Sequence, residues 1–205
     1  MSPPLFTQDD AWTGGFYELA IEVGPRSDAR LERLLHAVWN EPTLEGCYLD
    51  REREPDDQKK VAASLDRMAE QGHLRGIATL PNTMRVPCGT VAIREEDGSD
   101  WLDFYLPLGA LSSLDSRVGG FPFEEGSDSR AWREPIDCWL AEVARRAFEL
   151  VPFTLGLIGF EVSGRCYGKD VNESGVPDPR EISYLHASEG ALAVYATNRW
   201  HTGPA

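Results

Sequence analysis

The chain has 205 residues, of which 41% are hydrophobic and 26% are charged, and its formal net charge is −14. This composition is typical of a globular protein with a substantial core and excludes a disordered chain. The acidic charge argues against binding to nucleic acid, whose phosphates need basic side chains, and to an anionic membrane surface. It is compatible with a basic partner protein or a cationic small molecule, and it is equally typical of an ordinary soluble protein.

Targeting signals are not visible in the sequence. There is no apolar run of about eighteen residues, so no membrane span is expected. The first residues, MSPPLFTQDDAW, show no basic segment followed by an apolar one, so no secretory signal is expected either. The four cysteines, Cys47, Cys88, Cys138 and Cys166, lie far apart and form no C-x-x-C pair. We therefore expect a cytoplasmic protein with reduced thiols, no metal and no cofactor.

Hydrophobic periodicity predicts the elements of the first half. Residues 16–23, FYELAIEV, alternate between apolar and polar side chains, which indicates a half-buried strand with Glu18 and Glu22 on its polar face. Gly72 is expected to end a helix, and Pro87 is expected at an edge or a bulge of its strand. In chain order we predict a strand at 16–23, a helix from 27 or 28 to 39, a strand at 44–50, a helix from 56 or 57 to about 72, and strands at 74–80 and 85–95.

The second half contains the longest predicted helix. Pro135 stands where a first helical turn tolerates proline, and Pro152 ends the apolar stripe that follows. The segment 109–133 is too long for an ordinary connection, so it is functional, mobile or hides a short helix. In chain order we predict a strand at 101–108, this loose segment, a helix at 134–151, a central strand at 153–162, a polar loop at 167–181, and a hairpin at 182–188 and 191–198.

These elements predict an α+β fold with a mostly antiparallel sheet or sheets and two to three packed helices, in a single compact domain over residues 1–205. The order strand, helix, strand, hairpin occurs twice, at 16–95 and 101–198. One interpretation is an internal duplication of this unit. The other is chance recurrence, because the two halves share few identical residues.

Glu161 is an unusual carboxylate because it stands in the apolar stretch TLGLIGFEVSG, residues 154–164. Burying an unpaired acid is unfavourable. In one interpretation the strand ends here, and Glu161 faces solvent or pairs with Arg145 or Arg165. In the other, Glu161 projects into a pocket with a raised pKa or a cationic partner. The Ser-Gly pair that follows favours the first interpretation.

Three more acidic residues, Glu18, Glu22 and Asp103, occupy polar positions of predicted strands. With Glu161 they could gather on one sheet face and bind a cation or a basic side chain. The alternative is that they simply face water. The sequence contains no calcium-binding loop and no H-E-x-x-H motif, so it predicts no metal site.

Aromatic residues mark a second candidate surface. Tyr105 occupies a polar strand position, and Phe121 and Phe123 lie in the loose segment beside Glu124 and Glu125. Exposed aromatic side chains are favoured at binding surfaces, so an acidic segment with aromatic anchors would suit a basic protein partner. The alternative is that these rings fold back over the core.

Catalytic motifs are missing from the sequence. It contains no G-x-S-x-G elbow, no Walker loop and no G-x-G-x-x-G after a strand. His186, in the predicted final hairpin, is the best candidate for a general base, with Glu161 as the second acid–base residue. Whether the chain is an enzyme stays open, and the missing motifs favour a binding protein.

The leading hypothesis is a cytosolic binding protein, of a kind found in bacteria, whose acidic surface engages a basic partner protein. An immunity or inhibitor protein that masks a cationic toxin is a concrete example. The alternatives are a small-molecule binder with an acidic groove for a cationic ligand, and an enzyme that uses Glu161 and His186. The predicted binding residues are Glu18, Glu22, Asp103, Tyr105, Phe121, Phe123 and Glu161.

Overall fold

The computed structural model describes residues 4–96, 98–118, 130–173, 182–188 and 190–196. The strands are β1 Phe16–Pro25, β2 Leu44–Tyr48, β3 Leu74–Thr79, β4 Arg85–Arg94, β5 Ser99–Pro107, β6 Leu155–Phe160, β7 Ser183–Ser188 and β8 Ala191–Tyr195. The α-helices are α1 Asp28–Trp39, α2 Leu65–Gln71, α3 Leu108–Leu114, α4 Arg130–Leu150 and α5 Gly168–Glu173, and a short 3-10 helix covers Pro55–Asp57.

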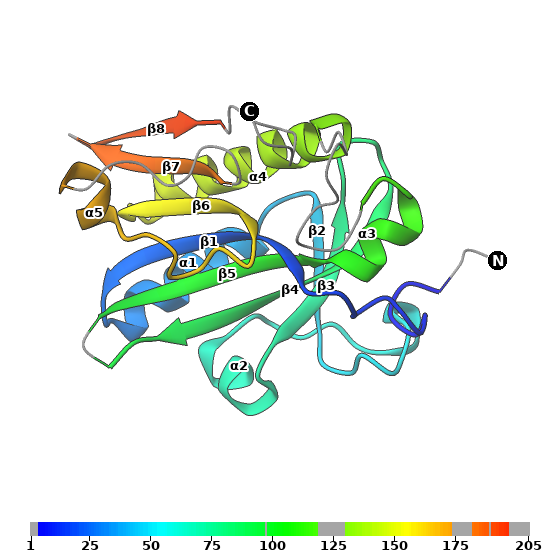
Figure 1. The fold of residues 1–205 in the computed structure, drawn as a ribbon. Helices are drawn as coiled ribbons and strands as arrows, with labels where there is room; N and C mark the ends of the chain where they lie inside the picture. The colour runs from blue at the N-terminus through cyan, green and yellow to red at the C-terminus, as the bar shows by residue number, and fades with distance from the viewer. Residues whose placement is uncertain (1–3, 97, 119–129, 174–181, 189, 197–205) are drawn as a thin grey trace.

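One antiparallel sheet of eight strands, in the order β2-β3-β4-β5-β1-β6-β7-β8, takes strands from both halves of the chain (Figure 1). The predicted α+β fold is therefore confirmed. No helix in the described ranges is long and apolar enough to cross a membrane.

The two first strands of the predicted halves, β1 and β5, pair with each other at the centre of the sheet. Outside them the order differs between the halves. The last strand of the first half, β4, flanks β5, whereas the first remaining strand of the second half, β6, flanks β1. The internal duplication stays a prediction.

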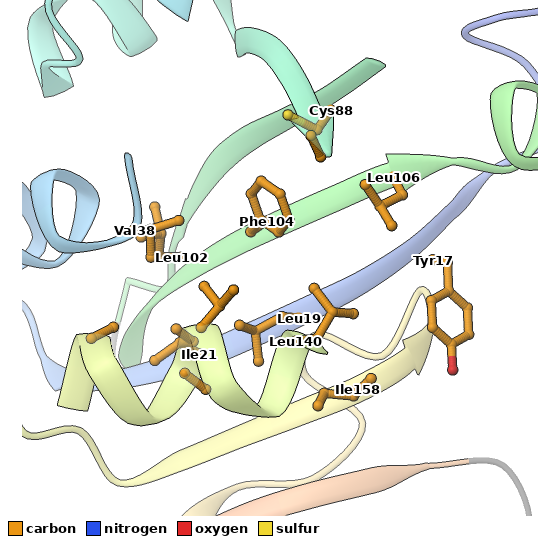
Figure 2. Close-up of a cluster of buried hydrophobic side chains, with 14 of the residues drawn as sticks. Tyr17, Leu19, Ile21, Val38, Cys88, Leu102, Phe104, Leu106, Leu140 and Ile158 are labelled. Atoms are coloured by element: carbon orange, nitrogen blue, oxygen red, sulfur yellow. The ribbon is translucent and has the colours of Figure 1, made fainter. Parts of the chain in front are cut away.

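Alternation along the strands divides the sheet into two faces, as the sequence predicts. Leu19 of β1 lies in register with Phe104 of β5 and Ile158 of β6, and all three are fully buried. Helices α1 and α4 pack against this face (Figure 1). Figure 2 shows the resulting core, to which these strands and helices contribute Tyr17, Leu19, Ile21, Val38, Leu102, Phe104, Leu106, Leu140 and Ile158.

Irregular segments and short helices, rather than long helices, cover the opposite face of the sheet. At the β2–β3 side, Phe6 packs on Tyr48 and Ile77. At the β1–β6 side this face is covered by residues 161–173, which we call the cover segment. Its Val162 is fully buried in a second apolar cluster with Trp101 and Leu157, among others. This second covering layer determines the environment of the acidic residues on β1 and β5.

Several sequence predictions of single positions are confirmed. Gly72 ends α2 with a φ of 75°, which favours glycine. Pro87 lies in the part of β4 that only β3 reaches, because pairing with β5 begins at Gly89. The loose segment contains the short helix α3, and β6 is buried along its whole length as a central strand.

Helix boundaries required three corrections. The helix predicted from residue 56 or 57 begins only at Leu65, because Val61 forms backbone hydrogen bonds with Cys47 and Ser64 accepts from the N–H of Arg67 as a cap. Helix α4 begins at Arg130 instead of residue 134, so Pro135 stands inside it. The polar loop predicted at 167–181 begins with α5.

Candidate functional site

The acidic residues of β1 and β5 share one face of the sheet, as their strand positions predict. In register, Glu18 lies opposite Tyr105, and Ala20 lies opposite Asp103. They do not face water, however. Glu18 is 4% exposed, Glu22 is 5% exposed and Asp103 is 2% exposed. The cover segment buries them, so the alternative of a solvated polar face is wrong for these three side chains.

Glu18 holds the start of the cover segment. Its Oε1 accepts hydrogen bonds from the backbone N–H of Val162, at 2.6 Å, and of Ser163, at 3.1 Å. Burial raises the pKa of Glu18 to about 7, the two backbone donors oppose this rise, and the charge of Glu161 adds to it. A carboxylate that accepts backbone N–H groups satisfies donors that the irregular segment would otherwise leave unpaired.

Glu22 holds the next part of the same segment. Its Oε2 accepts from the N–H of Gly168 at 2.6 Å, and its Oε1 accepts from the hydroxyl of Ser99 at 2.7 Å. A Cβ at position 168 would overlap with the side chain of Thr154, so only glycine brings this N–H so close to β1. Two glutamates of one strand therefore fix the cover segment at two points.

Asp103 lies on β5 between these two clamps and is the least satisfied of the three. Its Oδ1 is buried and has no hydrogen-bond partner among the described residues. Burial raises the pKa of Asp103 to about 8, and the neighbouring charge of Glu18 raises it further, while a hydrogen bond with the Ser163 side chain opposes the rise. The buried Nε1 of Trp101, on the same strand face, also has no hydrogen-bond partner within the described ranges.

Tyr105 is also buried on this face, at 2% exposed. Its hydroxyl lies 3.0 Å from Nδ1 of His73, and its ring packs against Phe16 with the centroids 4.3 Å apart. Tyr105 is therefore an interior packing residue, and its ring is not exposed for a partner. The candidate aromatic anchors Phe121 and Phe123 lie outside the described residues.

Glu161 differs from the other carboxylates because it is exposed. It directly follows β6, with a φ of 44°, and its N–H donates to the carbonyl of Phe16. The strand ends here and the side chain turns outward, which is the interpretation that the following Ser-Gly pair favoured. No ion pair within the described ranges joins Glu161 to Arg145 or Arg165.

His186 does not share a cavity with Glu161. It is buried on β7 and pairs with Leu155, the first residue of β6, whereas Glu161 follows the last one. At about 3.3 Å per residue these positions are separated by about 20 Å along the strand. One hydrogen bond or one water cannot bridge that distance, so the two residues do not form an acid–base pair.

Another buried carboxylate, Asp137 of α4, accepts hydrogen bonds at both of its oxygens. Its Oδ1 accepts a very short hydrogen bond from the hydroxyl of Tyr17, and its Oδ2 accepts from Ser183 Oγ at 2.6 Å. Arg133, which is 1% exposed, donates to the same tyrosine oxygen at 3.2 Å. Burial raises the pKa of Asp137 to about 6, against the charge of Arg133. The network ties α4 to β1 and β7.

A groove of about 690 Å³ lies between α1, α2 and β4. The buried side chains Leu31 and Met68 form part of its floor, together with Ala92 of β4. Three carboxylates stand along it, Asp28, Glu32 and Asp66. The groove thus combines an apolar floor with a rim of three carboxylates and one arginine, Arg94, so its net charge is acidic.

Both helices that border the groove are held in place by carboxylate contacts. Glu32 Oε2 accepts from the N–H of Leu65 at 2.8 Å and so fixes the start of α2 against α1. At the other end, Arg94 donates to Asp28 at 2.6 Å and forms two bonds to Asp100, at 2.9 Å and 3.0 Å. Asp66 lies in the first turn of α2 and is exposed. These contacts make the groove a preformed feature.

Sequence reasoning missed the groove. Asp28 and Glu32 are four residues apart on α1, which places them on one side of that helix, and this spacing was a usable signal. The position of α2 against that side could not be read from the sequence, because α2 begins only at Leu65. Among the described residues there is no group of three or more metal-binding side chains that could hold an ion.

The chain matches no protein-family model, no curated protein and no solved structure. Its function must therefore be inferred from the groove and from the covered sheet face.

Proposed function

We propose that the protein is an acidic binding protein that engages a basic partner protein, and that the partner inserts into the groove between α1 and α2. The observation that carries this proposal is the acidic rim above an apolar floor, on a chain whose net charge is −14. An immunity or inhibitor protein that masks a cationic surface is a concrete form of this function.

The groove has the chemistry that basic side chains need. Lysine and arginine have long apolar stems that pack on hydrophobic surface while their charged ends remain near water or carboxylates. Leu65 and Ala92, which are half-buried, offer such a surface, and the buried Leu31 and Met68 lie beneath it. Asp66 is exposed, and Asp28 is exposed as well, although it already accepts a hydrogen bond from Arg94. The large negative charge also speeds the encounter with a cationic partner.

The proposal includes a cytoplasmic location. All four cysteines are free, and a reducing compartment is where free thiols are typical.

A small organic cation is the second candidate occupant. Its specific support is the groove volume of about 690 Å³, which falls within the range of small-molecule sites, roughly 300–1,000 Å³. A ligand with a protonated amine and an apolar ring would match the rim and the floor in the same way as a basic side chain.

The test compares two variants that lose the same charge. Asp28→Asn with Asp66→Asn removes two rim carboxylates, and Asp9→Asn with Asp10→Asn removes two exposed carboxylates outside the groove. Binding of an arrayed library of lysine-rich and arginine-rich peptides is measured at low and high salt. We expect the rim variant to bind about tenfold more weakly and the control variant to bind like the wild type.

Equal weakening in both variants would refute the groove as the site and leave only a general charge effect. If no peptide binds but a cationic dye such as rhodamine 6G binds the wild type and not the rim variant, the small-molecule function replaces the protein partner. If neither probe binds, the proposed function is wrong.

A further inference from the structure

The cover segment is attached to the sheet through carboxylates rather than through a strand ladder. Glu18 accepts the N–H groups of Val162 and Ser163, and Glu22 accepts the N–H of Gly168. Apolar contacts complete the attachment, since Tyr167 meets Trp101 edge to face with the ring centroids 5.7 Å apart. The state of the carboxylates therefore bears directly on whether this segment stays closed.

Asp103 places a second carboxyl group next to the Glu18 clamp. The register puts it opposite Ala20, between the positions of Glu18 and Glu22 on β1, and it is almost completely buried. Its Oδ1 has no partner among the described residues. Two ionised carboxylates at this depth, without a bound cation, would be strongly unfavourable.

Charged and polar groups approach the pair from each packed element, and on β1 itself the buried Glu22 lies two positions beyond Ala20 on the same face. From the cover segment, Glu161 and Arg165 act on Glu18 through their charges, and the Ser163 side chain acts on Asp103 through a hydrogen bond. From β5, Tyr105 lies opposite Glu18. No lysine or arginine in the described part of the chain forms an ion pair with Glu18 or Asp103. Within the described residues, a proton is therefore what neutralises the pair.

We infer that at neutral pH Glu18 and Asp103 share one remaining proton while the cover segment is closed, and that loss of this last proton loosens the Val162–Ser163 end of the segment. This proton-dependent opening of the cover segment does not depend on the proposed function of the groove. Opening exposes the sheet face beneath, including the Nε1 of Trp101, which has no hydrogen-bond partner in the part of the chain that the structure describes.

The direction follows from linkage. Burial raises the pKa of Glu18 to about 7 and that of Asp103 to about 8, and these two values describe the coupled pair. In the open segment both groups meet water and ionise in their ordinary range. The closed state therefore binds the proton more tightly, and its population falls as the pH rises. Opening is expected on the alkaline side of neutrality.

The experiment follows the full chain by NMR between pH 5 and 10. The carboxyl carbons of Glu18 and Asp103 are titrated, and amide exchange at Val162 and Ser163 is compared with the unstructured rate at each pH. We expect carboxyl titrations well above the ordinary range, and a loss of exchange protection at both amides of about tenfold or more between pH 7 and pH 9. Gly168, held by Glu22, serves as the internal control and should change less.

A variant separates the shared proton from general alkaline loosening. Asp103→Asn cannot carry the second charge, so protection at Val162 and Ser163 should become independent of pH across the same range. An unchanged pH dependence in this variant would overturn the inference. So would carboxyl carbons that titrate in the ordinary acidic range in the wild type, a measurement that needs no variant. A midpoint that moves with sodium concentration at constant ionic strength would also overturn it, because a cation would then occupy the place of the proton.

Discussion

The stability of the protein should fall as the pH rises from 6 to 8, because of Asp103. The pKa of this group is raised to about 8 by burial, whereas an unfolded chain ionises it in the ordinary range. Between pH 6 and pH 8 the folded state therefore retains a proton that the unfolded state has already lost. The free energy of unfolding falls by about 1.4 kcal/mol per pH unit well below the folded pKa and by less near pH 8, so the expected loss from Asp103 is about 2 kcal/mol.

The sign is opposite for the carboxylates with lowered pKa values. Asp100, held by Arg94, stabilises the fold above its ordinary pKa and loses that contribution only in acid. Asp137 acts in the same direction as Asp103, but its pKa is raised only to about 6, so its contribution is lost below the chosen window. Glu18 adds to the fall up to about pH 7.

The assay is urea unfolding, monitored by tryptophan fluorescence at pH 6, 7, 8 and 9. Asp103→Asn should remove most of the fall in the free energy of unfolding between pH 6 and pH 8. Glu149→Gln, which removes an exposed carboxylate of α4, is the matched control and should keep the wild-type dependence. A wild-type stability that stays constant or rises across this window would refute the reasoning.

Three further predictions concern single contacts. Asp100→Asn leaves Arg94 without its buried partner and should lower the free energy of unfolding by about 3 kcal/mol, measured by urea unfolding at pH 7; a loss below about 1 kcal/mol would show that the pair has little net effect. Glu54→Gln weakens the acceptor for the N–H groups of Leu5 and Phe6, so limited proteolysis should cut the N-terminal segment faster while the thermal midpoint changes by only a few degrees. Leu140→Ala opens a cavity in the main core and should cost about 3 kcal/mol in chemical denaturation, and a cost near zero would contradict the packing in Figure 2.

Local sequence patterns predicted those elements whose burial is decided by their own periodicity. Residues 16–23 alternate, so β1 has one apolar face whatever it packs against. Gly72 ends α2 because a positive φ is a local requirement, and Pro87 avoids the doubly paired part of β4 because it lacks an N–H. These outcomes depend only on residues that are close together in the sequence, so they can be predicted from it.

The start of α2 shows where local patterns stop being informative. Val61 has helical spacing to Leu65 and Met68, but its backbone pairs with Cys47 on the outer side of β2 instead. That pairing provides hydrogen-bond partners for the free backbone groups of the edge strand β2. Helical periodicity does not indicate such a pairing.

The sequence by itself determined that this protein is α+β and that Glu18, Glu22 and Asp103 occupy polar positions of their strands, and it favoured a strand end at Glu161. Only the tertiary structure decided that the first three are buried and the last is exposed. The physical reason is that alternation reports which side of a strand a residue occupies, whereas burial depends on what lies over that side. Here the cover segment lies there, and it comes from residues more than 140 positions away from Glu18, as its hydrogen bond to Val162 shows.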